Sequence, residues 1–173
     1  MAIRTVEKDR GYNEFMRELK KIKRQPIVKV GFQEEKGNAL HPGGSMGTKP
    51  LTVVQVATFN EFGTEDADGN LHVPERSFIR STMDEKRREL LKVNKKLYRQ
   101  IAEGTMSTER ALKILGIKIK ALIQKKITDL RKPANAPSTI RRKRSSNPLI
   151  DTGLMRQSVT YKVDMDGRKA KTA

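Results

Sequence analysis

The chain has 173 residues, no cysteine and two histidines, and its 37 Lys and Arg side chains against 20 Asp and Glu give a formal net charge of +17. This length fits a single domain with a core of moderate size. The lack of cysteine excludes disulfide bonds, cysteine-ligated zinc and thiol catalysis, and two histidines leave little for an all-histidine metal site. We therefore expect no metal ion and no cofactor.

Neither a membrane span nor a secretion signal is predicted. The sequence has no uninterrupted apolar stretch of about 18 residues. Residues 1–10 lack the apolar block of a signal peptide. We expect a soluble protein that stays inside the cell that makes it and has no membrane partner.

The positive charge is concentrated in the second half of the chain. Residues 1–83 carry 13 basic and 11 acidic side chains, residues 84–132 carry 15 and 6, and residues 133–173 carry 9 and 3. A basic surface of this kind attracts polyanions over about a Debye length, roughly 8 Å at physiological salt. DNA, RNA or an acidic protein is the expected neighbour. Base-specific recognition has no support, because this half lacks aromatic residues at base-stacking intervals.

The N-terminal segments predict a helix, a strand and a loop. Between Tyr12 and Ile22 apolar residues recur every three or four positions, which is typical of an amphipathic helix, and Pro26 ends it. The β-branched run at 27–32 predicts a strand of the core sheet. Residues 33–49 contain four glycines and little apolar area, so we expect a long mobile loop there.

Residues 51–62 have two interpretations. Their β-branched residues favour a strand, whereas the apolar spacing and Gly63 directly afterwards favour a helix that ends at a glycine, and we choose the helix. The acidic stretch 65–70 predicts a turn. Residues 71–74 predict an extended segment, because the residue before Pro74 avoids the helical region.

Two long helices are predicted to follow. Ser81 with Asp84 three residues later resembles a capping box and begins a helix that ends at Gly104. Ser107 caps a second helix, which Pro133 ends. This second helix is the predicted core helix because it has a broad apolar stripe, formed by Ala111, Leu112, Leu115, Ile119, Leu122, Ile123, Ile127 and Leu130. We expect the pair to form a helical hairpin.

The C-terminal part predicts a short helix, a strand and a tail. Residues 139–144 favour a short helix with Thr139 as its cap, and the alternation of apolar and polar residues at 159–163 predicts a half-buried strand. Residues 164–173 are a polar tail. The predicted fold is α+β, with an antiparallel sheet packed against helices that include the long hairpin, in one domain spanning residues 1–163.

Three sequence patterns resemble catalytic or ligand-binding motifs, and each fails a requirement. Residues 43–47 match a hydrolase nucleophile elbow around Ser45, but prolines lie where a strand and a helix are needed. Residues 44–49 have the wrong order for a phosphate loop. Residues 66–77 begin like a calcium loop but lack its glycine and its final glutamate. We predict no catalytic residue, and a Ser45-dependent hydrolase is the second alternative function.

A basic run near the C-terminus consists of Arg141, Arg142, Lys143 and Arg144. Such a run either contacts phosphates or is a solvated surface segment. The positive charge of the second half of the chain favours a contact with phosphates. These four residues are therefore candidate contacts to DNA or to a partner. A nucleic-acid-binding protein without sequence specificity is accordingly the first alternative function.

Three segments resemble motifs of one protein family. Residues 56–64 contain Asn60-Glu61-Phe62-Gly63, which is similar to the family's Asn-Glu-Phe-Gly helix ending. Residues 73–80 share Pro74 and Arg76 with its Ile-Pro-Ala-Arg-Pro-Phe-Leu-Arg stretch, and residues 148–161 contain Asp151-Thr152-Gly153 of its Pro-Leu-Ile-Asp-Thr-Gly motif. In their order and spacing these segments resemble the tail-completion or virion-morphogenesis family of tailed bacteriophages, which includes minor tail protein Z-like and Mu-like morphogenesis proteins. Glu75, Ser77 and Leu154-Met155 depart from the common pattern.

The resemblance, which covers residues 26–163, implies a non-enzymatic structural protein of the virion. It places the chain in the head–tail connector, neck or upper tail, as a homo-oligomeric ring, a hexamer, around the DNA channel. The implied partners are neighbouring neck or connector proteins, the tail tube or terminator proteins, and packaged DNA. The motif residues then have structural roles: Phe62 lies inside, Gly63 ends a helix, Pro74 directs the chain to the next helix, and 151–153 form a turn.

Overall fold

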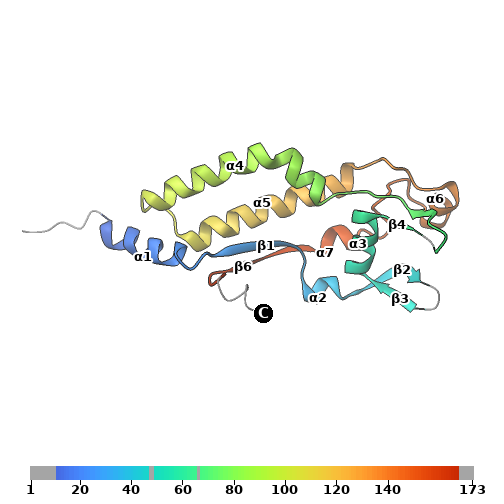
Figure 1. The fold of residues 1–173 in the computed structure, drawn as a ribbon, viewed down its shortest axis with the longest axis horizontal. Helices are drawn as coiled ribbons and strands as arrows, with labels where there is room; N and C mark the ends of the chain where they lie inside the picture. The colour runs from blue at the N-terminus through green and yellow to red at the C-terminus, as the bar shows by residue number, and fades with distance from the viewer. Residues whose placement is uncertain (1–10, 47–48, 66, 168–173) are drawn as a thin grey trace, which may run out of the picture.

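The computed structural model describes residues 11–46, 49–65 and 67–167, and this part of the chain is elongated (Figure 1). Its elements in chain order are α1 (Tyr12–Ile22), β1 (Ile27–Phe32), α2 (Glu34–Gly37), β2 (Leu40–Met46), β3 (Lys49–Thr52), α3 (Val53–Phe62), β4 (Thr64–Glu65), β5 (Leu71–Val73), α4 (Arg80–Ala102), α5 (Thr108–Asp129), α6 (Pro137–Lys143), α7 (Leu154–Ser158) and β6 (Val159–Asp164). The α+β prediction is confirmed, and the described strands form three antiparallel two-stranded sheets.

The sheet of β1 and β6 has one apolar face. Its antiparallel register places Val28 opposite Val163, Val30 opposite Tyr161 and Phe32 opposite Val159. Because side chains alternate along a strand, all six of these residues share one face, and this face packs against α5. The strands predicted at 27–32 and 159–163 are both confirmed.

Gly116 marks the closest approach of α5 to this sheet. A Cβ atom at Gly116 would lie 2.6 Å from Cδ2 of Tyr161 and 3.0 Å from Cγ2 of Val28. The helix therefore contacts the sheet with its backbone at this point. Ile123 and Ile127 are fully buried in the main core further along α5, so the prediction of this segment as the core helix is confirmed.

α4 packs on α5 and forms the outermost of three layers, with the β1–β6 sheet on the other side of α5 (Figure 1). Its buried apolar residues are Leu90, Leu97 and Ile101. Two ion pairs cross from α4 to α5, with Nζ–Oε1 distances of 2.6 Å for Lys126–Glu85 and 2.6 Å for Lys118–Glu89. Among the described residues, no helix is long and apolar enough to cross a bilayer.

α1 lies at the end of the molecule where α4 connects to α5, and Glu18 joins it to α5. Glu18 is 6% exposed. Its Oε2 accepts a 2.6 Å hydrogen bond from the backbone N–H of Thr108, the first residue of α5, and its Oε1 lies 2.6 Å from Nζ of Lys21. Burial raises the pKa of Glu18, but the bonds from Lys21 and Thr108 lower it more, so the net pKa lies below the ordinary value.

The prediction that residues 33–49 form one long loop is wrong, because the segment contains regular secondary structure. The segment contains α2 and the hairpin of β2 and β3, and residues 47–48 lie outside the described residues. The hairpin forms because extended backbone pairs its N–H and C=O groups across strands even where apolar side chains are few. The helix predicted for 51–62 exists from Val53, and the capping box of Thr52 and Gln55 begins it.

Two of the predicted helix caps are wrong and one is confirmed. α4 begins at Arg80 without a side-chain cap from Ser81, because a carboxylate from another helix occupies that place. α6 begins at Pro137, whose fixed φ suits the first helical position, so Thr139 lies inside the helix. Ser107 does cap α5, its Oγ accepting a 3.3 Å hydrogen bond from the N–H of Arg110.

Candidate functional site

The segments that carry the family resemblance lie at the end of the molecule opposite α1. There α3, α6, α7 and the connection into α4 come together (Figure 1), and α3 packs against α7. The core under them contains Val53, Ala57, Phe78, Leu149 and Met155. The predicted motif residues therefore lie on the connections between packed elements.

Glu61 caps α4 from the end of α3. It is 4% exposed, and its Oε2 accepts hydrogen bonds from the N–H groups of Phe78 at 2.7 Å and Ile79 at 2.9 Å. Its Oε1 accepts from the N–H of Arg80 and the hydroxyl of Ser77, both at 2.9 Å. The first N–H groups of a helix have no partner inside it, and an anion there also interacts favourably with the helix dipole. One side chain thus replaces the predicted local cap.

The same contacts keep Glu61 ionised. Burial raises the pKa of the carboxyl group, but the N–H bonds from Ile79, Arg80 and Phe78 and the hydroxyl of Ser77 lower it more. The net pKa lies below the ordinary value for glutamate, so the buried carboxylate carries its charge at neutral pH. Its charge is compensated by Arg80, whose Nε lies 3.2 Å from Oε1.

Arg80 covers Phe62, and the prediction that Phe62 lies inside is wrong. Phe62 is 60% exposed, and the guanidinium carbon of Arg80 lies 4.6 Å from the centre of its ring. The reason is the helical periodicity of α3. Ala57 and Glu61 are four residues apart and share the buried face, so Phe62, the residue after Glu61, lies on an outer face. The pair is a cation–π contact at the surface.

Arg76 joins three segments that are distant in the sequence. It is 5% exposed. Its Nε donates to the carbonyl of Pro133 at 2.8 Å, and its Nη2 donates to the carbonyl of Ala134 at 3.2 Å and to Oδ1 of Asn135 at 3.0 Å. Its Nη1 donates to Oδ1 of Asn60 at 3.3 Å, and its backbone N–H donates to the carbonyl of Asn60 at 2.7 Å. The end of α3 and the segment after α5 are therefore held by one guanidinium. Burial lowers its pKa.

Gly63 lets the chain turn tightly after α3, as predicted. Its φ of +76° is in the left-handed region, and a Cβ atom there would lie 3.0 Å from the carbonyl oxygen of Val73 and 3.1 Å from N of Glu75. Gly63 therefore meets the residues on both sides of Pro74, which leads from β5 toward α4. Only glycine combines this backbone angle with such a close approach.

The Asp151-Thr152-Gly153 segment forms the turn before α7. Gly153 has φ of +80° and occupies the N-cap position, and Oγ1 of Thr152 accepts a 3.3 Å hydrogen bond from the N–H of Leu154. Asp151 lies close enough to Lys143 for its charge to raise the pKa of that ammonium group. The segment thus acts through backbone geometry, and α7 leads directly into β6.

Lys143 differs from the other three residues of the predicted contact run, because it is bonded to the loop that follows α6. Its half-buried Nζ donates to the carbonyls of Asn147 at 3.3 Å and Pro148 at 3.1 Å. Burial lowers its pKa, and Asp151 opposes that effect. The ammonium group therefore holds the loop before α7. The other three residues of the run, Arg141, Arg142 and Arg144, are exposed.

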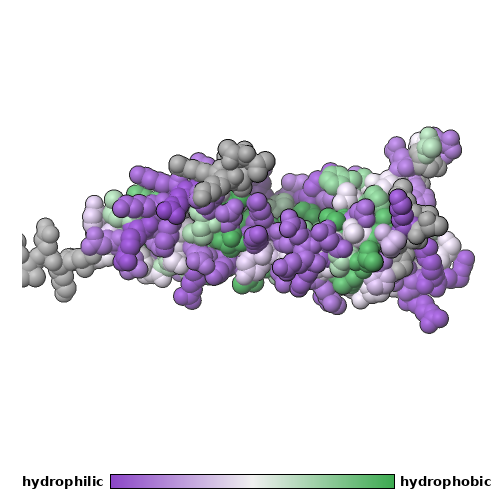
Figure 2. All heavy atoms as spheres, turned by 90° about the horizontal axis from the view of Figure 1, so that it is seen from below, coloured by the Kyte–Doolittle hydropathy of each residue, from purple (hydrophilic) through white to green (hydrophobic). Residues whose placement is uncertain are grey.

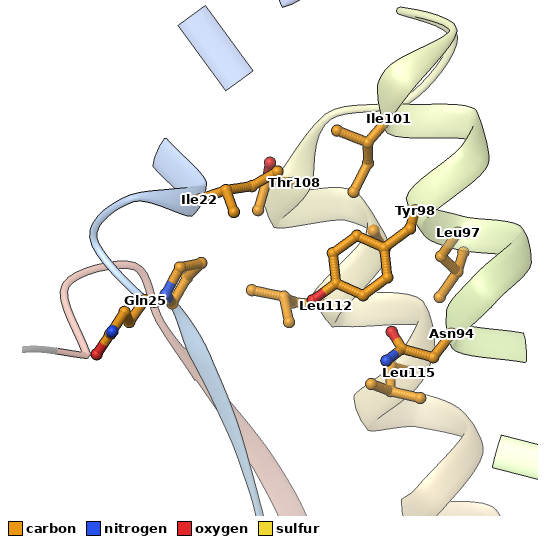
Figure 3. Close-up of a pocket in the computed structure, with 11 residues that line it drawn as sticks. Ile22, Gln25, Asn94, Leu97, Tyr98, Ile101, Thr108, Leu112 and Leu115 are labelled. Atoms are coloured by element: carbon orange, nitrogen blue, oxygen red, sulfur yellow. The ribbon is translucent and has the colours of Figure 1, made fainter. Parts of the chain in front are cut away.

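A groove runs along the junction of α4 and α5. One hollow of about 240 Å³ is lined by residues of α1, α4 and α5, among them Tyr98 and Leu112 (Figure 3). A second hollow of about 210 Å³ adjoins it, since Asn94 and Leu115 line both. Leu91 also lines the second hollow. The walls are mostly apolar, and they offer contact area without a set of converging reactive groups.

The structure does not place the residues of the catalytic-like sequence patterns in the geometry that those motifs need. Ser45 lies in β2, where it pairs with Pro50 of β3, so a second strand follows it where a nucleophile elbow needs a helix. Nδ1 of His41 is buried and has no hydrogen-bond partner among the described residues. Within the described residues, no group of three or more His, Asp or Glu side chains is arranged to hold a metal ion.

Sequence reasoning missed the use of buried carboxylates as helix caps. Glu18 follows Phe15 by three residues and precedes Ile22 by four, so it lies on the apolar face of α1. A charged residue on an apolar face indicates that its carboxylate has a buried hydrogen-bonding partner. Its partner, the N–H of Thr108, could not be found because it is 90 residues away.

No protein-family model, curated protein or solved structure matches the chain.

Proposed function

We propose that the chain is a structural protein of a tailed-bacteriophage virion, assembled in the host cytoplasm and placed at the head–tail connector, neck or upper tail. One observation carries the proposal. The residues that resemble the tail-completion family are the ones that join distant segments, with Glu61 holding the start of α4 and Arg76 holding the segment after α5. Such residues serve the shape of a subunit.

A structural role is further supported by how the buried ionisable groups are used. Glu61 accepts hydrogen bonds from three backbone N–H groups, and Glu18 accepts one from the start of α5. A general base needs a carboxylate that can take a proton from a substrate, and these two are already engaged by the protein itself. We therefore propose a non-enzymatic protein.

An oligomer is supported by apolar side chains that lie open on α4. Leu91 is 58% exposed and Tyr98 is 54% exposed, and Met83 lies on the same side of the helix. The face seen in Figure 2, which is opposite α4, is largely hydrophilic with smaller apolar patches. Open apolar surface is typical of places where subunits meet, and identical subunits that associate head to tail form a ring when the rotation between neighbours closes. We propose such a ring, a hexamer as the resemblance implies, in contact with neighbouring connector, tail tube or terminator proteins.

The test is the composition of purified particles. Virions, tails and free heads from a producing culture are separated, and the chain is measured in each fraction by mass spectrometry. The expected result is a fixed number of copies in virions, and a strain without the chain should accumulate heads and tails that are not joined. Infectious virions without the chain would overturn the proposal.

Two alternatives give different results in the same assays. A nucleic-acid-binding protein without a virion role is favoured by the net charge of +17, and it would bind DNA while being absent from particles. A hydrolase that uses Ser45 would lose its activity in a Ser45→Ala variant. Under the structural proposal, that variant joins heads to tails as well as the natural protein does.

A further inference from the structure

The four sides of α4 have different chemistry. One side carries Leu90 and Leu97 and packs on α5. A neighbouring side carries Glu85 and Glu89, which pair with lysines of α5. The opposite edge carries the exposed apolar residues next to the groove, such as Leu91. The remaining side faces away from α5, because residues 88, 92 and 95 are about half a turn from the packed positions, and residue 96 lies at its edge, next to the side of Glu85 and Glu89.

This outer side is a row of positive charges, which we call the α4 stripe and define as Arg88, Lys92, Lys95 and Lys96. All four residues are exposed. Their steps of four, three and one residue place them along one side of the helix, over about 12 Å at ~1.5 Å per residue. Within the described part of the chain, none of the four has an ion pair or side-chain hydrogen bond.

Two of the three acidic residues of α4 are engaged by lysines of α5, and the third, Asp84, lies one helical turn before Arg88. Glu85 and Glu89 lie toward α5, where their carboxylates are 2.6 Å from Nζ of Lys126 and Lys118 respectively. Lys86 also pairs with Glu89, at 3.7 Å. From residue 90 to residue 102 the helix has no acidic side chain at all. The stripe therefore keeps a net positive charge, because Asp84 is the one acidic residue of α4 that does not pair with a lysine of α5 in the described part of the chain.

The chemistry of the stripe fits the backbone of duplex DNA better than a single strand. Lys and Arg neutralise phosphates, and a duplex offers about one negative charge per 1.7 Å of its axis. Single-stranded nucleic acid is usually held by aromatic side chains that stack on bases, and the stripe has none. A straight helix with cations along one side matches a stiff rod of phosphates and carries no information about base sequence.

We propose that the α4 stripe is a binding site for the phosphate backbone of duplex DNA, without sequence specificity. The inference rests on the proposed function, since it names which surface of the ring subunit meets the DNA that passes through the connector. It also moves the DNA contact from the basic run at 141–144 to α4. The run is the weaker site because Lys143 is bonded to backbone carbonyls.

The experiment compares two triple variants of the full chain that lose the same charge. One is Arg88→Gln/Lys92→Gln/Lys95→Gln in the stripe, and the other is Arg141→Gln/Arg142→Gln/Arg144→Gln in the basic run. Glutamine is a good helix former, so circular dichroism should show the same helix content in both. Binding of a short mixed-sequence duplex is measured by fluorescence anisotropy between about 50 and 200 mM salt.

The stripe variant should bind about tenfold more weakly or worse, and the slope of log affinity against log salt should become shallower by about 2.7, or ~0.9 for each lost phosphate contact. The run variant should change both quantities much less. Equal affinity and slope for the stripe variant and the natural chain would overturn the inference. So would displacement of the duplex by polyglutamate at a lower charge concentration than by unlabelled duplex, since that would identify an acidic protein as the partner.

The two proposals fail separately. Absence of the chain from virions overturns the proposed function and leaves the salt slopes untouched. Unchanged slopes in the stripe variant overturn the DNA site and leave the virion composition untouched.

Discussion

Glu18 and Thr108 are 90 residues apart in the sequence, and the carboxylate of the first accepts a 2.6 Å hydrogen bond from the backbone N–H of the second. Glu61 has the same relationship to the start of α4, where it accepts from Phe78, Ile79 and Arg80. Both long helices thus begin at a buried carboxylate that another helix supplies. An anion at this position satisfies free N–H groups and the helix dipole together.

Replacing Glu18 should loosen α1. Glu18→Gln removes the charge that faces the start of α5 and leaves a weaker acceptor in a buried place, so we expect the free energy of unfolding to fall by about 1–3 kcal/mol. Urea unfolding measures this loss, and hydrogen exchange should show faster exchange in α1. The control is Glu14→Gln, an exposed position on the same helix. Equal stability of the two variants would show that the charge of Glu18 contributes nothing at the start of α5.

Replacing Glu61 should cost more than replacing Glu18. Glu61→Gln leaves several N–H groups of the α4 start poorly satisfied, because an amide offers one oxygen where the carboxylate offers two. We expect a loss of about 2–4 kcal/mol in urea unfolding. Glu75→Gln is the matched control, since Glu75 also pairs with Arg80 but is exposed. A Glu61 variant as stable as this control would contradict the capping role.

Stability should fall in mild acid because of these two carboxylates. Both have a pKa below the ordinary value in the folded chain, so the unfolded state takes up protons first as the pH falls through the ordinary glutamate value of about 4.3. Their stabilising contribution is complete above that pH and is lost as the pH falls through the lower folded value. Urea titrations should show a smaller acid loss for Glu18→Gln/Glu61→Gln than for Glu14→Gln/Glu75→Gln. If the stability of the two double variants fell equally with pH, Glu18 and Glu61 would not be the source of the acid sensitivity.

Arg76 should not be replaceable by lysine. Arg76→Lys keeps the charge, but an ammonium group cannot reach the carbonyls of Pro133 and Ala134 and the side chain of Asn60 with the geometry of a planar guanidinium. We expect a loss of about 2–4 kcal/mol in thermal or urea unfolding, since buried acceptors lose their donors. Arg141→Lys at an exposed position should change stability by less than about 0.5 kcal/mol. If both lysine variants unfold alike, Arg76 does not join these segments.

Gly116 should resist substitution although it lies inside a helix. Gly116→Ala raises helix propensity by about 1 kcal/mol, but its Cβ would lie 2.6 Å from Cδ2 of Tyr161. We expect the steric clash to outweigh the gain in helix propensity, so that the free energy of unfolding falls by about 1–3 kcal/mol. In a Tyr161→Ala background the same change should cost much less, because only the 3.0 Å approach to Cγ2 of Val28 remains, and a double-mutant cycle by urea unfolding measures the difference. A destabilisation of the same size in both backgrounds would rule out the contact with Tyr161.

The sequence by itself determined the elements whose signals are local. The helix at 12–22, the strand at 27–32, the core helix after Ser107 and the strand at 159–163 follow from the spacing of apolar residues, and the structure confirms each of them. The glycine stop at Gly63 is local as well, because it depends on a backbone angle that one residue adopts. Such features need only the nearest neighbours along the chain.

Tertiary structure alone decided which polar groups meet. No periodicity pairs Glu18 with Thr108, places Glu61 at the start of α4, or turns Phe62 outward and Lys143 toward two carbonyls. These outcomes depend on how the helices are packed, since an N–H group or a charge takes whichever partner the fold brings within about 3 Å. The side of α4 on which the cations remain unpaired was decided in the same way, by the lysines of α5 that pair with its glutamates.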